Sequence, residues 1–365
     1  MSALEEIGFC PERMENAFAL VQQMVQSDRI IGGTLTVGRN GHLLEPRVFG
    51  RMGSPEAPPV QPDTIFLIAS PSKPITTSAI CLLLERGQLA LEQPLRGIIP
   101  EVTEDKKDIR LIHLLTHTSG LPDMLPNNEE LRAAHQPLDV FVEHMCRVPL
   151  DFAPGSKVQY QSCGIALLGE VVKRITGMEV RDFIREEFFI PLGMKDSFLG
   201  RRDEGRSRIS DVRITAESAA TGWNWNTDFW HGFGAPWGGM FCTGTDYGRF
   251  LQMMLNGGEL EGVRIFSPAT VAKMTTDQIK LLPDLSTADR LGNAWGLGWW
   301  MTVTGKTEYL GDLASPRAFG HGGATGTGVL ADPATGLVFV FLTNQPGLAM
   351  EIGMVANAVV SAALE

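Results

Sequence analysis

Ser70 and Lys73 form a Ser-x-x-Lys pattern at the start of residues 70–86, a segment that is predicted to be a buried helix ending at Gly87. Residues three apart on a helix share a face, so the hydroxyl and the amine can lie within hydrogen-bonding distance. A lysine can take the serine proton when burial or nearby cations lower its pKa towards neutrality, and a helix N-terminus offers N–H groups to an oxyanion. The pattern therefore indicates nucleophilic catalysis; the alternative is a helix cap followed by an unrelated lysine.

Tyr160 and Ser162 follow the turn at residues 153–155 and form the second candidate pair. A phenol can pass a proton between Ser70 and a leaving group if nearby lysine charge stabilises its anion. This interpretation makes Tyr160 a proton relay. The alternative is a partly buried tyrosine whose hydroxyl donates to a backbone carbonyl.

His321, Gly322 and Gly323 form the third candidate group, within the glycine-rich segment 319–328. Paired glycines let a strand edge approach a substrate closely, and a free N–H there can complete an oxyanion hole. His321 is expected beside this N–H as a hydrogen-bond donor or as a pH-dependent group. The alternative is a glycine-rich turn with a surface histidine.

Patterns at both ends of the chain predict the elements that hold these residues. Residues 11–28 have apolar positions at helical spacing, and Asn40-Gly41 predicts a tight turn between two antiparallel strands. Two β-rich runs flank a turn at residues 332–336, and an apolar helix is predicted over residues 348–364.

The middle of the chain has a different character, because residues from about 90 to 200 show short helices separated by Pro and Gly. We therefore predict an α+β fold with two domains. Residues 1–90 and 205–365 would form a discontinuous sheet-and-helix domain, and residues 91–204 a mostly helical one. A length of 365 residues agrees with roughly two domains.

Composition and charge exclude several function classes. Apolar residues make up 44% and charged residues 20%, which is typical of a globular protein, and the net charge of −11 argues against nucleic acid as a partner. The N-terminal residues lack the pattern of a signal peptide, and no apolar run is long enough to span a membrane. The five cysteines include no closely spaced pair, so we predict a cytoplasmic protein with reduced thiols.

Metal and cofactor sites are not predicted. His113 and His117 lie four residues apart but lack a third ligand, which favours structural roles. Gly305-Lys306-Thr307 lacks the leading glycine of a phosphate-binding loop, and no G-x-S-x-G motif is present. A few of the tryptophans in the second half could line an apolar acyl pocket; they are Trp223, Trp225, Trp230, Trp237, Trp295, Trp299 and Trp300.

In their order along the chain, the three motifs resemble the signature of the serine β-lactamase and penicillin-binding-protein superfamily. Further stretches are similar to its class C branch: LIHLLTHTSGLPD at 111–123, PGSKVQYQSCGIALLGEVV at 154–172, WGGMFCTGTDYGRFLQMMLNGG at 237–258 and WGLGWW at 295–300. The resemblance extends over roughly residues 15–345. It implies a β-lactamase/transpeptidase-like fold, with an antiparallel sheet flanked by helices and an inserted, mostly helical domain that forms the other wall of the active site.

The resemblance also implies a role for each candidate residue. Ser70 would be the acylated nucleophile, Lys73 its general base and Tyr160 the proton relay. The backbone N–H groups of Ser70 and Ala324 would form the oxyanion hole. Substrate would contact the remaining motif residues, which are Ser162, His321, Gly322 and Gly323.

Two departures from the family pattern bear on the substrate. The third motif of β-lactamases and D,D-peptidases is Lys-Thr-Gly, so His321 removes the cation that binds a substrate carboxylate; Lys306-Thr307-Glu308 lacks the glycine and lies too far upstream to replace it. The second motif usually ends in Asn, which reaches further than Ser162.

We therefore expect a serine hydrolase of the β-lactamase-related esterase group, acting on a small-molecule ester or amide without a cofactor. The alternatives within enzymes are a D-aminopeptidase, a weak β-lactamase or a transacylase. The alternative from another class is a non-catalytic homologue that binds peptidoglycan fragments or a protein partner. The oligomeric state is not predicted.

Overall fold

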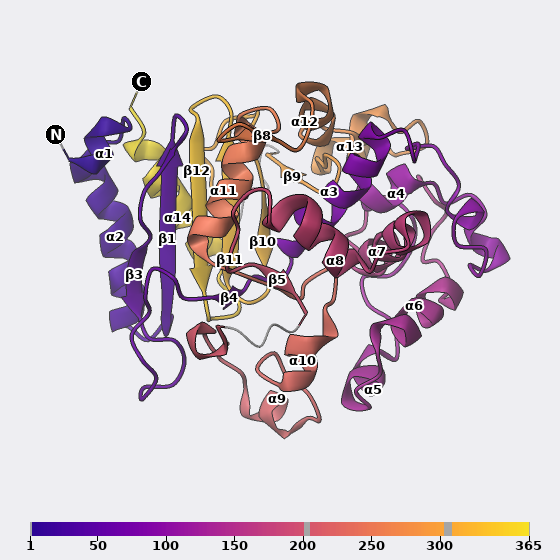
Figure 1. Cartoon of the computed structure of the whole chain (residues 1–365), viewed down its shortest axis with the longest axis horizontal. Helices are drawn as coiled ribbons and strands as arrows, with labels where there is room; N and C mark the ends of the chain where they lie inside the picture. The colour runs from indigo at the N-terminus through magenta and orange to yellow at the C-terminus, as the bar shows by residue number, and fades with distance from the viewer. Residues whose placement is uncertain (1, 201–204, 303–308, 365) are drawn as a thin grey trace.

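The structure is a computed structural model that describes residues 2–200, 205–302 and 309–364. Its main sheet is antiparallel and consists, within the described residues, of β1 (Gly32–Arg39), β2 (His42–Leu43), β3 (Arg47–Gly50), β9 (Trp300–Met301), β10 (Phe319–Gly323), β11 (Thr327–Asp332) and β12 (Leu337–Thr343). The strands lie in the order β2-β1-β12-β11-β10-β9, and β3 also pairs with β1 (Figure 1). Strands from the N-terminal and the C-terminal parts of the chain are thus neighbours in one sheet, where β1 pairs with β12. The Lys306-Thr307-Glu308 segment lies outside the described residues.

Both predicted hairpins are present. Asn40 and Gly41 have positive φ values of 53° and 88°, as a tight turn between β1 and β2 requires, and β11 pairs with β12 across residues 333–336. The strand predicted after Gly41 is interrupted, so that β2 and β3 pair with different parts of β1. Pro46 lies in this interruption and has no N–H to donate to the ladder.

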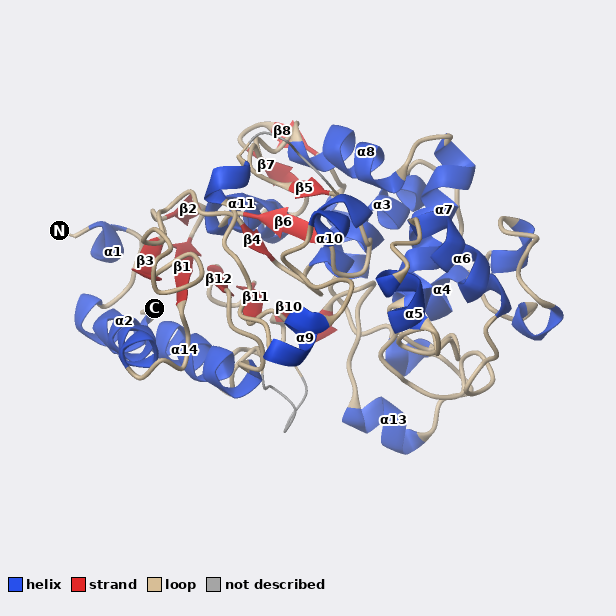
Figure 2. Cartoon of the chain, turned by 90° about the horizontal axis from the view of Figure 1, so that it is seen from below, coloured by secondary structure: helices blue, strands red, loops and turns tan. Residues whose placement is uncertain are grey.

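Helices cover both faces of the main sheet. α2 (Pro11–Gln26) and α14 (Ala349–Ala362) lie side by side on one face and enclose the smaller of two hydrophobic cores, and both helices agree with the sequence prediction (Figure 2). α11 (Gly244–Leu255) lies on the opposite face. The chain ends meet beside α1 (Ala3–Glu6), because the N–H of Cys10 donates to Ala362 at 2.8 Å and that of Leu364 to Gly8 at 3.0 Å.

The predicted helical segment packs on the far side of α3 (Ser72–Glu85), mainly through α7 (Cys163–Thr176). Its other helices are α4 (Leu111–Leu115), α5 (Asn128–Ala133), α6 (Leu138–Arg147), α8 (Val180–Ile184) and the short turns Leu95–Gly97, Glu104–Lys106 and Arg185–Phe189. The larger hydrophobic core runs without a break through this segment, α3 and α11, so the site rests on one continuous core. The domain boundaries at 91 and 204 stay a prediction.

The remaining elements follow β5 (Phe198–Leu199). They are the helices Arg206–Arg208, α9 (Ala216–Ala220), α10 (Asp228–Phe233), α12 (Pro268–Met274), Ile279–Leu281 and α13 (Thr287–Gly292), and the strands β6 (Met240–Cys242), β7 (Glu259–Leu260) and β8 (Val263–Arg264). No helix in the described part of the chain combines the length and the hydropathy needed to cross a bilayer. All five cysteines are free.

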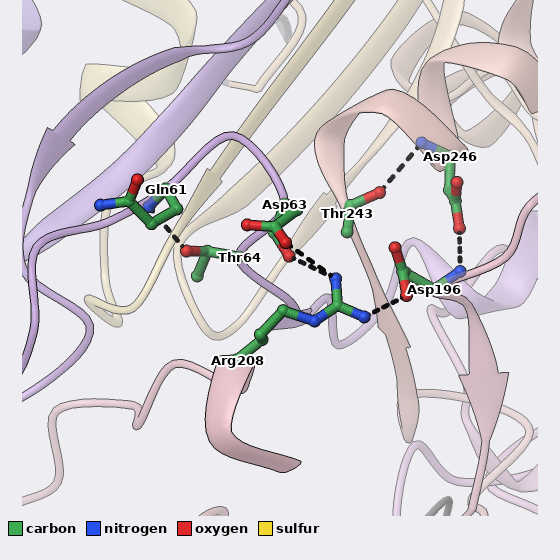
Figure 3. Close-up of polar contacts among 7 residues, drawn as sticks. All are labelled: Gln61, Asp63, Thr64, Asp196, Arg208, Thr243 and Asp246. Atoms are coloured by element: carbon green, nitrogen blue, oxygen red, sulfur yellow. Dashed lines mark hydrogen bonds and ion pairs between the residues drawn. The ribbon is translucent and has the colours of Figure 1, made fainter. Parts of the chain in front are cut away.

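A small second sheet, β4-β6-β5, fixes the strand that leads into Ser70, with β4 spanning Phe66–Leu67. Polar contacts beside it hold three segments together (Figure 3). The Arg208 guanidinium donates to the Asp63 carboxylate at 3.3 Å and also to the Asp196 carboxylate, while Asp246 accepts from the N–H of Asp196 at 2.8 Å. The approach to Ser70 is therefore anchored to both the helical segment and α11.

Candidate active site

Ser70 lies in the turn between β4 and α3, two residues before the helix begins at Ser72. Ala69 precedes it with φ 53°, in the left-handed region that costs an alanine about 1–2 kcal/mol. The Ser72 N–H and hydroxyl both donate to the Ala69 carbonyl, at 2.9 and 2.6 Å, and hold this conformation. The strained turn therefore presents Ser70 at the N-terminal end of α3 rather than inside its first turn, where the sequence predicted it.

Lys73 reaches back along α3 to the nucleophile. Its Nζ lies 3.2 Å from Ser70 Oγ and donates to the carbonyl of Trp237 at 2.9 Å. The side chain is fully buried, and this burial lowers its pKa from 10.5 to about 7, although the charge of Asp123 acts in the opposite direction. At neutral pH about half of the amine is therefore uncharged and able to accept the Ser70 proton.

Tyr160 lies over the same two groups. Lys73 Nζ is 4.6 Å from the centre of its ring, and Ser70 is close enough to act on the pKa of its hydroxyl. Burial raises the pKa of Tyr160, although Ser70 acts in the opposite direction, so the phenol keeps its proton at neutral pH. Lys73 is therefore the group that can act as a base here, and Tyr160 is a proton donor.

Ser162 is hydrogen-bonded to Asp123. Its hydroxyl donates to the Asp123 carboxylate at 2.7 Å, and its N–H donates to the Asp123 carbonyl at 3.0 Å. The side chain is buried and does not line the cavity described below. In this geometry Ser162 fixes the acidic residue that acts on the pKa of Lys73, whereas the sequence led us to expect a contact with substrate.

His321 is an uncharged ring with a defined tautomer. Its Nδ1 lies 2.7 Å from the carbonyl of Gly322, and because a carbonyl only accepts, Nδ1 carries the proton and Nε2 the lone pair. Burial, and then the charge of Lys73, lower the pKa of His321 to about 3. Nε2 has no hydrogen-bond partner among the described residues. His321 is thus a neutral ring that can accept a hydrogen bond at Nε2. The sequence predicted a hydrogen-bond donor or a pH-dependent group at this position.

His117 has the opposite tautomer. The N–H of Gln161 donates to its Nδ1 at 3.1 Å, so the proton lies on Nε2, which likewise has no partner within the described residues. Its ring packs 4.8 Å from that of Tyr160 and 4.2 Å from that of Trp295. Burial lowers the pKa of His117 well below its ordinary value. Both histidines next to the nucleophile are therefore neutral.

The two glycines of the third motif have different packing roles. A Cβ on Gly322 would lie 2.1 Å from the ring of Tyr309, so this glycine lets an aromatic ring lie flat on β10. A Cβ on Gly323 would lie 2.5 Å from the carbonyl of Ile68 and 2.8 Å from Pro71. Gly323 thus allows the end of β10 to approach the backbone on either side of Ser70.

Two segments that border the cavity each contribute a backbone N–H without a protein partner among the described residues. Within the described residues, the N–H groups of Ser70 and Ala324 donate to no protein acceptor, and both residues line the same cavity. Thr325 Oγ1 donates to the carbonyl of Leu67 at 2.7 Å, and Thr327 Oγ1 donates to the next carbonyl at 2.6 Å. These bonds fasten the β10–β11 turn to the nucleophile segment, an arrangement suited to an oxyanion hole.

The candidate residues open into a cavity of about 390 Å³. Its described lining consists of Ser70, Val158, Tyr160, Gly292, Asn293, Trp295, Trp300, Tyr309, His321, Gly322 and Ala324. The sequence predicted Ser70, Tyr160, His321, Gly322 and Ala324 as site residues, and the structure brings them together around this space. Lys73 lies directly behind Ser70.

Comparison with known proteins agrees with this geometry. The sequence model of the Beta-lactamase family matches residues 17–363. The chain belongs to the Beta-lactamase family. This membership places it in a superfamily of hydrolases that includes esterases, carboxypeptidases and β-lactamases.

Three Beta-lactamase-like relatives illustrate the range. An uncharacterised protein of Mycobacterium tuberculosis is 29% identical over 373 residues, which cover 91% of this chain and 90% of that protein. A protein of Escherichia coli O157:H7 that bears the name "Putative D-alanyl-D-alanine carboxypeptidase" is 26% identical over 381 residues, covering 94% of this chain and 85% of that one. The crystal structure of a family VIII carboxylesterase has a TM-score of 0.80 at 20% identity and covers 97% of this chain and 99% of that chain, so the fold is shared.

Several residues of this Beta-lactamase-family site escaped the sequence analysis. Asp123 lies in a stretch that carries the family resemblance, but no spacing ties it to Ser162 or Lys73. Tyr309 and Asn293 belong to no recognisable motif, and both lie in loops that border the cavity. His113, one of the histidines weighed as a metal ligand, accepts from the N–H of Arg110 at 3.2 Å and is not at the site.

Proposed function

We propose that this protein is a serine hydrolase that cleaves carboxylic esters through an acyl-enzyme at Ser70. The observation that carries the proposal is Lys73 Nζ at 3.2 Å from Ser70 Oγ, with a pKa of about 7. An amine with this pKa is matched to proton transfer at neutral pH. Tyr160 supplies the second proton that ester cleavage needs.

Acylation then proceeds in a balanced sequence. Lys73 takes the Ser70 proton as Oγ attacks the ester carbonyl carbon, and the carbonyl oxygen gains charge beside the N–H groups of Ser70 and Ala324. The C–O bond to the alcohol breaks, the Tyr160 hydroxyl protonates the leaving oxygen, and the Lys73 ammonium returns a proton to Tyr160. Water repeats the sequence to release the acid and restore Ser70.

An ester is favoured over a substrate with a free carboxylate. No ionised side chain is present among the described residues that line the cavity, and His321 is neutral at the position where the family pattern has a lysine. A carboxylate placed there would lose its hydration without gaining a cation. The Escherichia coli relative is named for a peptidase whose substrate ends in a carboxylate. Peptidase activity is therefore the alternative that must be tested beside ester hydrolysis.

The test compares Ser70→Ala with Ser78→Ala, a matched control on the same helix whose hydroxyl donates to the carbonyl of Pro74. On a short-chain p-nitrophenyl ester, S70A is expected to fall to background and S78A to stay within a few-fold of wild type. Intact-mass measurement after a fluorophosphonate probe should show one adduct on S78A and none on S70A. Full activity of S70A would rule out the mechanism.

Further substrates in the same activity assay distinguish ester hydrolysis from the alternative functions. Nitrocefin and a D-amino-acid amide report β-lactamase and D-aminopeptidase activity, and an added alcohol or amine acceptor reports acyl transfer. Failure of the wild-type chain to form an adduct with any acylating probe would favour the non-catalytic homologue. A cytoplasmic location stays a prediction from the cysteine pattern.

A further inference from the structure

An aromatic wall forms one side of the cavity in front of Ser70. The rings of Trp295 and Trp300 are stacked at 5.8 Å with an angle of 14° between their planes, and that of Tyr309 lies 6.0 Å from Trp300 with its plane tilted by 53°. The wall is fixed from behind, because Trp295 and Trp300 form a β-bridge and Tyr309 lies on the Cα of Gly322. Aromatic rings held in fixed positions favour a planar aromatic guest, which can stack on the face of one ring and meet another edge to face.

The wall lies next to Tyr160, the residue that we propose to protonate the leaving group. The ring of Trp295 is 6.0 Å from the ring of Tyr160 and 5.9 Å from that of His321. In the proposed mechanism Tyr160 protonates the oxygen of the departing alcohol, so this oxygen must lie next to Tyr160 at that moment. The group attached to it then extends along Trp295 and Trp300.

The polar groups of the cavity fit an uncharged guest. Asn293 uses one of its two amide N–H groups to donate to the carbonyl of Asp289 at 3.1 Å, which leaves the other N–H and the side-chain oxygen of this uncharged amide for a guest. Nε2 of His321 is likewise an acceptor, because its Nδ1 donates to Gly322. Neither group neutralises an anion, and the described lining contains no Asp, Glu, Lys or Arg.

From these contacts we infer that the cavity is the subsite for the alcohol half of the ester, and that Trp295, Trp300 and Tyr309 select an uncharged planar alcohol of the benzyl type. The inference rests on the proposed ester hydrolysis and adds which half of the substrate is selected. It also implies that the acyl half extends outside this cavity, where it meets less constraint.

The experiment uses two acetate esters that differ only in the alcohol, benzyl and cyclohexylmethyl. Both alcohols are primary and of similar size, so planarity is the main difference. The measured quantity is the ratio of kcat/KM for the two esters, which reports the steps up to acylation even where deacylation limits kcat. The wild type is expected to prefer benzyl acetate by roughly 2- to 12-fold for each ring contact, since an aromatic pair contributes about 0.5–1.5 kcal/mol.

Trp300→Leu is the test variant, and Trp225→Leu is its matched control, because Trp225 is also a half-buried tryptophan but does not line the cavity. W300L should bring the benzyl preference close to 1 and W225L should leave it unchanged. Trp300→Phe should restore part of the benzyl preference. This result would show that W300L loses the preference because an aromatic ring is missing and not because the variant folds poorly. For one alcohol, the ratio of kcat/KM for the hexanoate ester to that for the acetate ester should be the same in all three variants as in the wild type.

A second measurement uses the reverse reaction. With benzyl alcohol added, its oxygen attacks the carbonyl carbon of the acyl-enzyme, the bond to Ser70 Oγ breaks, and the alcohol proton passes to Ser70 through Lys73 and Tyr160. The wild type should divert more acyl groups to benzyl alcohol than to cyclohexylmethanol, and W300L should not. An unchanged benzyl ratio in W300L, or a shift in the hexanoate ratio instead, overturns the inference. If the wild type hydrolysed none of these esters, this result would instead count against the proposed function.

Discussion

The pH dependence of acylation offers a direct test of the Lys73 environment. Burial lowers the pKa of this lysine from 10.5 to about 7. At pH 7 about one half of the amine is then neutral, compared with roughly 0.03% of an exposed lysine, a gain of about 1,600-fold in free base. We expect kcat/KM for an uncharged ester to rise about tenfold per pH unit below 7 and to level off above it.

Asp123→Asn is the informative perturbation. The charge of Asp123 raises the pKa of Lys73, so its removal should move the midpoint of the profile to lower pH by a fraction of a unit. The asparagine keeps an oxygen that can accept from Ser162, whose hydroxyl now donates to Asp123 at 2.7 Å. Glu130→Gln is the control, because it removes the same charge from an exposed side chain.

The assay is kcat/KM for benzyl acetate from pH 5 to 9 in all three proteins. The midpoint belongs to Lys73 because the two histidines nearby do not titrate in this window: the pKa of His321 is about 3 and that of His117 is well below its ordinary value. A flat profile between pH 5 and 9 would refute the assignment of Lys73 as the base. A midpoint that rises in D123N, or that E130Q moves as far as D123N does, would refute the electrostatic argument.

Three further predictions concern the groups around Ser70. Between pH 7 and 10.5 the unfolded chain binds more protons at Lys73 than the folded chain does, so its burial costs stability that is recovered as the pH rises. Lys73→Met should therefore be inactive but more stable than wild type in urea at pH 7, by up to about 4 kcal/mol, and should lose this advantage towards pH 10.5; a less stable K73M at pH 7 would contradict this. Tyr160→Phe should lower kcat/KM by about 100-fold or more, and a loss below tenfold would remove Tyr160 as the proton donor. Gly322→Ala should destabilise the fold by about 1–3 kcal/mol in thermal unfolding, because its Cβ would lie 2.1 Å from the ring of Tyr309; the loss should shrink in a Tyr309→Ala background, and simple additivity would count against this contact.

The sequence predicted the elements that carry regular patterns. The helical spacing before Gly32, the Asn40-Gly41 turn and the apolar C-terminal helix all appear in the structure, because each pattern acts through local backbone preference and burial. The three-residue spacing of Ser70 and Lys73 likewise brought their side chains together, since Ser70 lies in the turn just before α3 and Lys73 in the first turn of that helix.

The missed features depend on tertiary contacts. Nothing in the identity of Ala69 signals a left-handed residue, which is held there by bonds from Ser72. The tautomer of His321 depends on how its ring meets the carbonyl of Gly322, and the effect of Asp123 on Lys73 depends on the packing of a distant loop. Spacing along the chain carries no information about such contacts, so the sequence could name the reacting groups but not their protonation states.

The bonds that fasten the β10–β11 turn to the nucleophile segment join residues far apart in the chain, since Thr327 and Ile68 are separated by 259 positions. A ribosome adding about 5–20 residues per second needs roughly 13–50 s to cover that interval. During synthesis Ser70 and Lys73 therefore exist for this interval without the N–H of Ala324 and without β10, and the arrangement suited to an oxyanion hole forms only after residue 324 has been added. We therefore expect that a chain truncated before residue 320 would keep Ser70 and Lys73 but would lack the activity that we propose for them.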